Sequence, residues 1–399
     1  MNELNQVTVK YHPVGQGLFS SGILKFNSGF FRWIYDCGSS HKKMGVVKSA
    51  IDVLKSSENH YEDVDMLVLS HFDEDHILGC CEILNSFKVK RVILPYMPLW
   101  KRIVLAYKHS VDTSNNSFEF YINPSSYIKS ISEHTEVIFV SAKENEMQSY
   151  NEEEKEGEEE RDNSLIFEYE KVFIDNEFSR IGYKDGFIKS GGMVTVGVYW
   201  EFIFHNDEAG YLKASDRFKK EIDKLTSDLL EHKSYEQLAA LKNNYSDIFG
   251  KKDKDKNIIS LFMYAAPLSS LNFHIEIEGS LNTKDCLPFD NYNLFLRKNG
   301  FLYTGDGSLK KDEALSSLNE TLGMFRVDNI LCLQVMHHGS KNNWKEGIAE
   351  KLNPSLSVFS SNPTGEYKHP HMEVLRDFWG NHPVQVDQSN IFIVDITLI

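Results

Sequence analysis

Apolar residues recur with two different periods at the start of the chain. The runs VTVKY (7–11), GILKF (22–26) and FRWIYD (31–36) are rich in β-branched and aromatic residues, and the turn signals PVGQG and NSG separate them. This pattern predicts short antiparallel strands. In the next segment, MGVVKSAIDVLKSS (44–57), apolar residues recur at helical spacing, which predicts a helix.

Continuous apolar runs alternate with helical segments further along. DMLVLS (65–70) and RVILP (91–95) predict strands that are covered on both faces, and ILGCCEILNSF (77–87) between them predicts a helix. The order strand, helix, strand is typical of the α/β class. Further strand-like runs occupy 135–141, 191–206, 258–265, 293–308, 330–340 and 355–361. The last three of them end in polar clusters, at the strand ends where α/β folds place their sites.

An acidic run and a helical segment interrupt this pattern. NEEEKEGEEERDN (151–163) carries a net charge of −6 and predicts a solvated loop. Apolar residues at helical spacing predict a helical insertion at 211–256, which is a candidate surface for a protein partner, although such stripes more often pack within their own chain. We therefore divide the chain into an N-terminal half (1–145), an insertion of acidic loop, strand and helix (146–256), and a C-terminal half (257–399).

Composition limits the class of protein and its partners. The chain has 399 residues, 41% of them hydrophobic, which is enough for one large domain with an insertion or for two small domains. Its net charge of −15 argues against broad electrostatic binding of duplex nucleic acid, so a nucleic-acid substrate would be held locally. Five scattered cysteines, without a signal-peptide pattern or a membrane-length apolar stretch, predict a cytoplasmic protein with no membrane association.

The stretch LSHFDEDHILG (69–79) places His71, Asp73, Asp75 and His76 in one loop between a predicted strand and a predicted helix. His71 and Asp73 can face one point, and Asp75 and His76 another. Imidazole and carboxylate groups together suit Zn²⁺, Mn²⁺ or Fe²⁺, and crowding them without a cation costs repulsion and desolvation. The loop therefore predicts a metal site rather than a polar surface turn.

Three later segments add ligand-type side chains at strand ends. Asp306 lies in TGDGS, although a GDG pattern taken alone is most often a turn. His337 and His338 follow a buried apolar run in HHGS, which is an unusual position for paired histidines. In YKHPHMEVL, His369 and His371 come immediately before a predicted helix. These side chains are candidates for the same site as the first loop.

Together these segments resemble the metallo-β-lactamase fold hydrolases, and within them the hydrolase domain of the ComEC-like DNA-uptake proteins and its soluble relatives. The resemblance rests on segments that occur in the family's order: VGQG (14–17) with YDCG (35–38), SHFDEDHILG (70–79), FLYTGDGS (301–308), and HHGSKN (337–342) with HPHMEVL (369–375). It covers nearly the whole chain apart from the acidic and helical middle. It implies an αββα sandwich of the α/β class, interrupted by the insertion.

The resemblance implies two divalent metal ions, Zn²⁺ or Mn²⁺. His71 and Asp73 would hold the first ion, and Asp306 would bridge both. Two positions depart from the family pattern. Asp73 replaces the second histidine of the usual signature, which makes the site harder and more tolerant of Mn²⁺. The family's third-motif histidine is absent from RVILPYMPLWKR (91–102), and His109 lies some distance further on.

The second ion would be held by Asp75, His76 and one histidine of the HHGS segment. His337 is favoured because it comes first after the strand, and His338 is a close rival.

The remaining residues of the resemblance have supporting or catalytic roles. Asp36, which ends an early strand, would orient the loop that carries the metal ligands. His369 would lie opposite the metals as a phosphate contact or a proton donor. Ser340 and Lys341 would help to hold a phosphate, and Asp75 would take or steer the proton of the attacking water.

The resemblance and the hard ligands imply a metal-dependent phosphodiesterase or nuclease that cleaves nucleic acid, with DNA favoured, through water activated by two metals. Three alternatives remain open. A phosphodiesterase of a small or cyclic nucleotide would suit the acidic surface better. The others are an ester or lactone hydrolase, and a non-catalytic interaction module in which metal serves stability alone.

Overall fold

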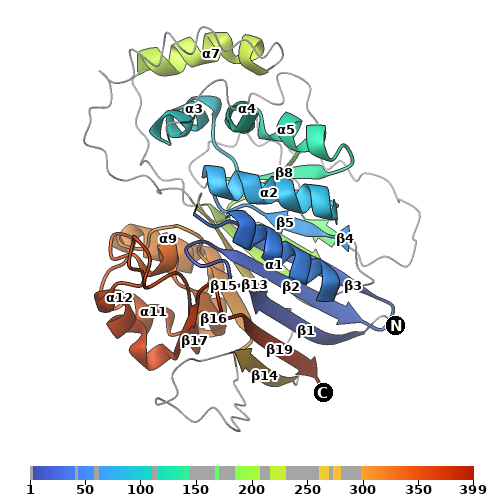
Figure 1. Cartoon of the computed structure of the whole chain (residues 1–399), viewed down its shortest axis with the longest axis vertical. Coiled ribbons are helices and arrows are strands. Elements are labelled where there is room, and N and C mark those ends of the chain that lie inside the picture. Colours follow the sequence, from blue (N-terminus) through green and yellow to red (C-terminus); the bar gives the residue numbers. More distant parts are fainter. Residues whose placement is uncertain are drawn as a thin grey trace.

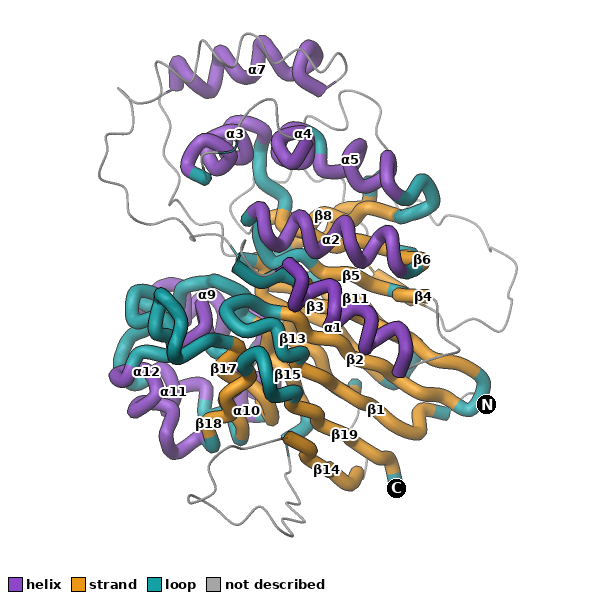
Figure 2. Tube along the Cα trace, viewed as in Figure 1, coloured by secondary structure: helices purple, strands orange, loops and turns teal. Residues whose placement is uncertain are grey.

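The computed structural model describes most of the chain, namely residues 3–40, 44–57, 63–109, 111, 116–142, 167–169, 185–206, 216–230, 260–268, 273–279 and 298–399. Within these residues the strands form two large mixed sheets, with helices on their outer faces (Figures 1 and 2).

The first sheet has nine strands within the described residues. In spatial order they are β10 (Gly186–Lys189), β8 (Glu136–Ser141), β7 (Arg91–Pro95), β5 (Met66–Val68), β3 (Gly29–Cys37), β2 (Phe19–Phe26), β1 (Leu4–Tyr11), β19 (Phe392–Leu398) and β14 (Phe273–Gly279). The strands from β10 to β3 are parallel, and those from β3 to β14 are antiparallel.

The second sheet has eight strands within the described residues. In spatial order they are β18 (Pro383–Val386), β17 (Leu356–Ser360), β16 (Ile330–Gln334), β15 (Gly300–Tyr303), β13 (Leu261–Pro267), β12 (Trp200–Asn206), β11 (Met193–Val196) and β9 (Phe167–Tyr169). It is parallel from β18 to β15 and antiparallel from there to β9. A small parallel pair, β4 (Asp63–Val64) with β6 (Lys88–Val89), lies apart from both sheets.

Helices cover the outer faces of both sheets. Those packed in the core outside the first sheet are α1 (Met44–Ser57), α2 (Glu74–Ser86), α3 (Leu99–Lys108), α4 (Asn116–Ile122), α5 (Pro124–Ile131) and α7 (Asp216–Leu230). Those packed outside the second sheet are α9 (Asp312–Leu322), α10 (Met324–Asp328), α11 (Ile348–Leu352), α12 (Met372–Asp377) and the short turns η2 (Met336–Gly339) and η3 (Phe378–Asn381). The layers therefore follow the order helix, sheet, sheet, helix.

Aromatic side chains fill the space between the two sheets. Trp33 of β3 packs against Trp200 and Phe202 of β12, with ring centroids 6.0 and 5.3 Å apart. Tyr35 of β3 stacks on Tyr303 of β15 at 4.8 Å. All five side chains are fully buried. Because the other face of each sheet is covered by helices, the central strands are apolar on both faces, which explains their continuous apolar runs.

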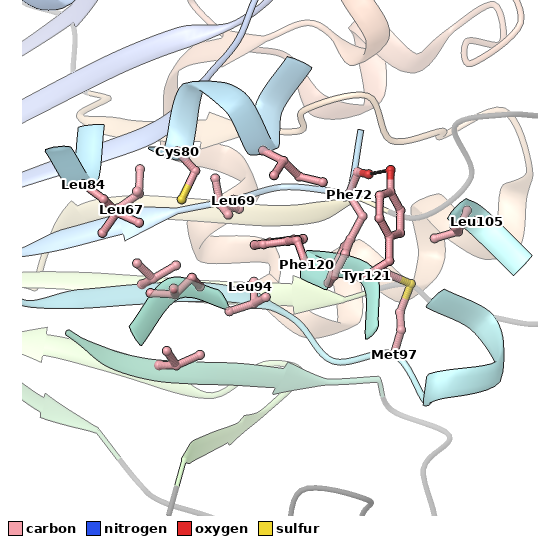
Figure 3. Close-up of a cluster of buried hydrophobic side chains, with 14 of the residues drawn as sticks. Leu67, Leu69, Phe72, Cys80, Leu84, Leu94, Met97, Leu105, Phe120 and Tyr121 are labelled. Atoms are coloured by element: carbon pink, nitrogen blue, oxygen red, sulfur yellow. Dashed lines mark hydrogen bonds between the residues drawn. The ribbon is translucent and has the colours of Figure 1, made fainter. Parts of the chain in front are cut away.

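A second core lies between the first sheet and its helices. Figure 3 shows part of it, where Leu67 of β5 and Leu94 of β7 face the helices that cross above them. Cys80 and Leu84 of α2 and Phe120 of α4 complete this region and are also buried. The apolar stripe of α2 therefore holds this helix, and the loop before it, against the carboxyl ends of the strands.

The predicted α/β class is confirmed, and most elements lie where the pattern placed them. Helix α1 spans the residues that were predicted, 44–57, and the strands predicted around 31–36, 91–95 and 355–361 are β3, β7 and β17. The run at 191–206 is a hairpin of two strands, because the chain turns at Gly197, which has a φ of 55°.

Helix α2 begins at Glu74, so the prediction that one loop holds all four ligand-type side chains is wrong for Asp75 and His76. Both residues lie in the first turn of α2, and Asp73 is its N-cap. Carboxylates at a helix start are favoured because the free backbone N–H groups there carry a partial positive charge. Part of the acidic cluster that the sequence pattern assigned to the loop therefore belongs to the helix.

Helix α7 confirms the helical prediction for residues 216–230. Phe218 and Ile222 are buried in the core outside the first sheet, and the Lys219 amine lies 5.1 Å from the centroid of the Trp100 ring in α3. The apolar stripe of α7 therefore packs within the molecule. The acidic run 151–163 and residues 231–256 of the predicted insertion lie outside the described residues, so a partner surface there and the division of the chain at 145 and 256 stay predictions.

Among the described residues, every helix falls short of the length and apolar character needed to cross a bilayer.

Candidate metal centre

Four strands bring predicted site residues to one edge of the two sheets. In the first sheet, Asp36 lies at the end of β3 and His71 follows β5, and these strands are parallel neighbours. In the second sheet, Asp306 follows β15 and His338 follows β16, which are also parallel neighbours. Parallel neighbours place their carboxyl ends at the same edge, so each sheet presents two site residues there.

Hydrogen bonds hold the two sheets together at this edge. The N–H of Leu261, at the start of β13, donates to the carbonyl oxygen of Ser70 at 2.7 Å, and the Tyr35 hydroxyl donates to the carbonyl oxygen of Leu261 at 2.6 Å. At the end of β16, the buried side-chain oxygen of Gln334 accepts from the N–H of Thr304 at 2.9 Å. The loop that carries His71 is therefore tied to β13 of the second sheet, and the loop that carries Asp306 is tied to the end of β16.

Asp306 lies at the centre of the cluster and is buried. Its Oδ2 is 3.6 Å from Nε2 of His337 and 3.9 Å from Nε2 of His71, and its Oδ1 is 3.2 Å from Nε2 of His338. One carboxylate thus faces histidines that come from both sheets. This placement is compatible with the bridging role predicted for Asp306.

His109 joins the cluster from the C-terminal end of α3. Its Nε2 lies 3.2 Å from Oδ1 of Asp73, whose Oδ2 lies 3.6 Å from Nε2 of His71. Asp73 therefore lies between two histidines. This arrangement supplies a third side chain at the position where the sequence offered His71 and Asp73 alone.

A hydrogen bond fixes which ring nitrogen of His71 carries the proton. The Ser70 hydroxyl donates to Oδ2 of Asp36 at 2.5 Å, so its oxygen is left to accept from Nδ1 of His71 at 2.6 Å. The proton of a neutral His71 ring is therefore on Nδ1, and Nε2 keeps its lone pair.

The same reasoning applies to His109. The Tyr121 hydroxyl donates to the carbonyl oxygen of Phe72 (Figure 3), so its oxygen accepts from Nδ1–H of His109 at 3.0 Å. The Nε2 lone pair of His109 is consequently directed at the carboxylate of Asp73.

Both histidines of the HHGS segment also carry their ring proton on Nδ1. The amide nitrogen of Asn343 donates to the carbonyl oxygen of Asp306 at 3.1 Å, so its amide oxygen accepts from Nδ1–H of His337 at 2.9 Å. Nδ1–H of His338 donates to the carbonyl oxygen of Ser360 at 2.7 Å. In each case Nε2 retains a lone pair and faces Asp306.

The cluster fits divalent cations. In all four histidines an Nε2 lone pair faces a carboxylate oxygen 3.2 to 3.9 Å away, and two acceptors in that position repel each other. Atoms that bind one ion at about 2.1 Å in tetrahedral geometry lie about 3.4 Å apart, a value that the measured distances bracket. The buried Nε2 of His71 has no hydrogen-bond partner among the described residues.

The charges of the cluster support the same conclusion. Burial raises the pKa of Asp306, but His337 and His338 outweigh it and hold this pKa well below the ordinary range. Burial lowers the pKa of His338 to about 4. Burial and His76 lower the pKa of His71, but the carboxylates of Asp73 and Asp306 more than offset them and the pKa is raised. The carboxylates of the cluster therefore favour positive charge at this position, which a bound cation would supply.

Asp36, His71 and His76 form a second group close enough to hold an ion. The Asp36 carboxylate, however, already accepts from the N–H and the hydroxyl of Ser70, at 2.7 and 2.5 Å, and its Oδ1 is 3.4 Å from Nδ1 of His76. We therefore assign Asp36 to holding Ser70 and His76 in place, which is compatible with the supporting role predicted for it.

The predicted ligands of the second ion are described in part. His76 lies beside His71, with ring centroids 4.1 Å apart, and both His337 and His338 reach Asp306. The His338 side chain is 6% exposed and the closer of the two, whereas that of His337 is 24% exposed. Distance therefore gives His337 no preference. The side chain of Asp75 lies outside the described residues.

The predicted substrate contacts lie around the cluster. His369 is buried, and its ring centroid is 5.8 Å from that of His337. Ser340 is buried, and its hydroxyl accepts a backbone N–H within its own turn. Lys341 is exposed, and its N–H donates to Nδ1 of His371 at 3.3 Å.

Sequence reasoning missed His109, Ser70, Tyr121 and Asn343. Ser70 belongs to the SHFDEDH motif, and a hydroxyl directly before a predicted metal-ligating histidine is a signal that could have identified it. His109 ends a helix that follows a strand of the first sheet, which is a weaker signal. Tyr121 and Asn343 act through contacts with distant or adjacent loops and leave no recognisable spacing.

Comparison with known proteins identifies short segments of similarity. No protein-family profile matches the chain. It is 35% identical over 78 residues to Recombination protein 2 of Haemophilus influenzae, a match that covers 20% of this chain and 9% of that protein. It is 29% identical over 83 residues to ComE operon protein 3 of Bacillus subtilis, which covers 21% of this chain and 10% of that protein. The chain thus matches about a tenth of the length of these curated relatives.

Proposed function

We propose that this chain is a metal-dependent phosphodiesterase of the metallo-β-lactamase fold, related to the ComEC-like hydrolases, and that it cleaves nucleic acid, with DNA as the favoured substrate. The observation that carries the proposal is the set of four Nε2 lone pairs that face the carboxylates of Asp73 and Asp306. Divalent ions are the partners that such a donor set requires. The four-layer arrangement, with ligands at strand ends in the family's order, supports the fold.

Two groups of side chains would hold the ions, with Asp306 shared between them. The groups are His71, Asp73 and His109 on one side, and Asp75, His76 and His338, or His337 beside it, on the other. Imidazole combined with carboxylate suits Zn²⁺ or Mn²⁺. When bound, such a pair lowers the pKa of a bound water to near neutral and stabilises charge on the reacting oxygens.

Residues of the chain would position the phosphate. Burial, together with the neighbouring His338 and His337, lowers the pKa of His369 to about 3. His369 therefore stays neutral near pH 7, so it would contact a phosphoryl oxygen as a hydrogen-bond donor rather than deliver a proton as an acid. Lys341, exposed nearby, would add a positive charge, and Asp75 would steer the proton of the attacking water.

Two observations favour a nucleic-acid substrate. Asp73, in place of a histidine, makes a harder ligand set of the kind that suits phosphate chemistry. The Haemophilus relative is named for recombination, a process that acts on DNA. The net charge of −15 does not support nucleic acid as the substrate and disfavours a long duplex, so a nucleic-acid strand would be held locally. The same charge favours a small cyclic nucleotide as the second candidate substrate.

A cleavage assay with defined metals tests the proposal. Purified protein is analysed for bound metal, loaded with Mn²⁺ or Zn²⁺, and incubated with single-stranded DNA, duplex DNA, RNA, cyclic nucleotides and a panel of esters. We expect metal-dependent cleavage of DNA. Cleavage of cyclic nucleotides alone would favour the second candidate, and hydrolysis of esters alone would contradict the proposal.

A pair of matched substitutions separates the metal centre from a contaminating nuclease. Asp306→Asn removes the charge at the centre of the cluster, so we expect bound metal and cleavage to be lost together. Asp312→Asn makes the same chemical change six positions further on, at an exposed residue of α9, and we expect no effect. Equal cleavage by both variants would assign the activity to another protein.

A further inference from the structure

The VGQG segment (14–17) lies in the loop between β1 and β2 and reaches the loop that carries His369. The side-chain oxygen of Gln16 accepts from the N–H of Asn362 at 3.4 Å, and its side-chain nitrogen lies 3.1 Å from Nδ1 of His369. Gln16 and His369 are 353 positions apart in the sequence. They meet only because β1 and the last third of the chain are adjacent in the fold.

The direction of these hydrogen bonds follows from the chemistry of the groups. A backbone N–H can only donate, so the Gln16 atom that faces Asn362 is the amide oxygen. The other end of the amide is then the NH₂ group, which donates to Nδ1 of His369. Because Nδ1 accepts, the proton of the neutral imidazole is on Nε2.

The ring proton of His369 is therefore on the opposite nitrogen from that of the metal-facing histidines, the four whose Nε2 faces a carboxylate. In His71, His109, His337 and His338, Nδ1 donates and Nε2 keeps a lone pair, which suits a metal ligand. In His369, Nδ1 accepts and Nε2 carries a hydrogen, which suits contact with an anionic oxygen. Its ring centroid nevertheless lies only 5.8 Å from that of His337. The chain thus places one hydrogen-bond donor beside a set of lone pairs.

We propose that Gln16 is a positioning residue that fixes the tautomer of His369, so that its Nε2–H donates to an oxygen of an anionic substrate held at the metal centre. The identification of the substrate as a phosphate ester rests on the proposed function. The tautomer itself follows from the hydrogen bonds alone.

The backbone on both sides of this contact is held in place. The N–H of Ser40 donates to the carbonyl oxygen of Gln16 at 2.8 Å, which anchors the VGQG segment to the loop after β3. Gly339 has a φ of 83°, and a Cβ there would lie 2.6 Å from Cβ of Pro370, so the loop that carries His369 packs directly on the HHGS segment. The N–H of His371 also donates to the carbonyl oxygen of Gly339 at 3.0 Å. The amide is therefore presented to His369 by a fixed scaffold.

The tautomer can be measured without any substrate. Full-length, zinc-loaded protein is labelled with ¹⁵N-histidine, the signals of His369 are assigned from their loss in His369→Gln, and spectra are recorded at pH 8, above the ordinary pKa of histidine. We expect a protonated Nε2 and an unprotonated Nδ1. In Gln16→Glu the side chain can only accept, so we expect the proton on Nδ1. A wild-type ring protonated on Nδ1, or an unchanged ring in Gln16→Glu, would overturn the inference.

The consequence for catalysis is measured with the substrate that the cleavage assay identifies. We expect kcat/KM of Gln16→Glu to fall about 10- to 100-fold, the usual effect of disturbing a hydrogen-bond partner of a site residue. Gln388→Glu is the control for charge, because Gln388 is exposed and lies beside the VGQG segment, where a Cβ added at Gly15 would be 2.7 Å from Cγ of Gln388. Equal losses in both variants would show an effect of charge and would refute the role of Gln16.

The two measurements distinguish failure of this inference from failure of the proposed function. If the tautomer changes as expected but kcat/KM does not fall, Nε2–H of His369 is not a substrate contact and the inference is refuted, while the hydrolase remains. If no substrate is cleaved by the wild type, the proposed function fails, and the ¹⁵N spectra still decide whether Gln16 sets the tautomer.

Discussion

The hydroxyl of Tyr121 is a point at which the proposed metal centre can be weakened without changing a side chain that would bind metal. It accepts from Nδ1–H of His109 at 3.0 Å and donates to the carbonyl oxygen of Phe72. Tyr121→Phe keeps the buried ring and removes both hydrogen bonds. His109 then loses the partner that directs its Nε2 lone pair towards Asp73.

The size of the effect follows from these contacts. Removing the hydrogen-bond partner of a metal-bound histidine weakens metal binding roughly 10- to 100-fold, or about 1.4 to 2.7 kcal/mol. Because His109 contacts Asp73 and not Asp306 in the described residues, we expect this loss for one of the two proposed ions. The buried carbonyl of Phe72 also loses its donor, which would lower the free energy of unfolding by about 1 to 3 kcal/mol.

Competition between the protein and a zinc chelator measures the two affinities separately. The control is Tyr127→Phe, because the Tyr127 hydroxyl lies in the same helical layer, 3.4 Å from Sγ of Cys81, and has no contact with a metal-facing histidine in the described residues. We expect one of the two ions to be released at lower chelator concentration in Tyr121→Phe and neither ion in Tyr127→Phe. Wild-type affinity for both ions in a folded Tyr121→Phe protein would refute the assignment of His109 to the site.

Three further predictions concern stability. Burial lowers the pKa of His12 from 6.5 to about 3, so between these pH values unfolding takes up a proton and the free energy of unfolding falls as pH falls. Between pH 7 and 5 we expect the wild type to lose about 2 kcal/mol of this free energy, as measured by urea unfolding. The His12→Gln variant should not show this loss. In Gly79→Ala the new Cβ would lie 1.3 Å from the carbonyl oxygen of Cys37, so α2 must move from β3, and we expect insoluble protein or a melting temperature far below that of the wild type. The Arg326 guanidinium donates to both carboxylate oxygens of the buried Glu201, at 2.8 and 2.9 Å. Arg326→Met leaves this carboxylate without its partner, so we expect the free energy of unfolding to fall by about 3 to 5 kcal/mol. Replacing both residues by apolar ones should recover most of this loss.

The sequence was most informative where the signal is local. Helix α1 was predicted at about the residues it occupies, because its apolar positions repeat within a few turns. The start of α2 was misplaced because Glu74 and Asp75 look like loop residues, although carboxylates favour a helix N-terminus. The alternation at 191–206 gave no sign that the chain reverses at Gly197, since both halves of a hairpin have the same period.

The same distinction between local and long-range signals applies to the residues of the candidate site. His71, Asp73, Asp306 and His338 were identified because each belongs to a short motif at a strand end. His109 was not, because nothing near it in the sequence shows that α3 ends beside Asp73. The histidine tautomers likewise depend on hydrogen-bonded pairs such as Ser70 and Asp36, which are 34 positions apart. A spacing pattern cannot contain such information, because the partners meet through packing.

The division of the ligands between the two sheets has a consequence for folding. His71, Asp73 and His109 come from the first sheet and its helices, whereas Asp306 and His338 come from the second. A cation bound by both groups would act as a cross-link across the sandwich. By thermodynamic linkage, metal binding and the closure of the two halves would then strengthen each other, and a chelator would loosen the whole molecule rather than one loop.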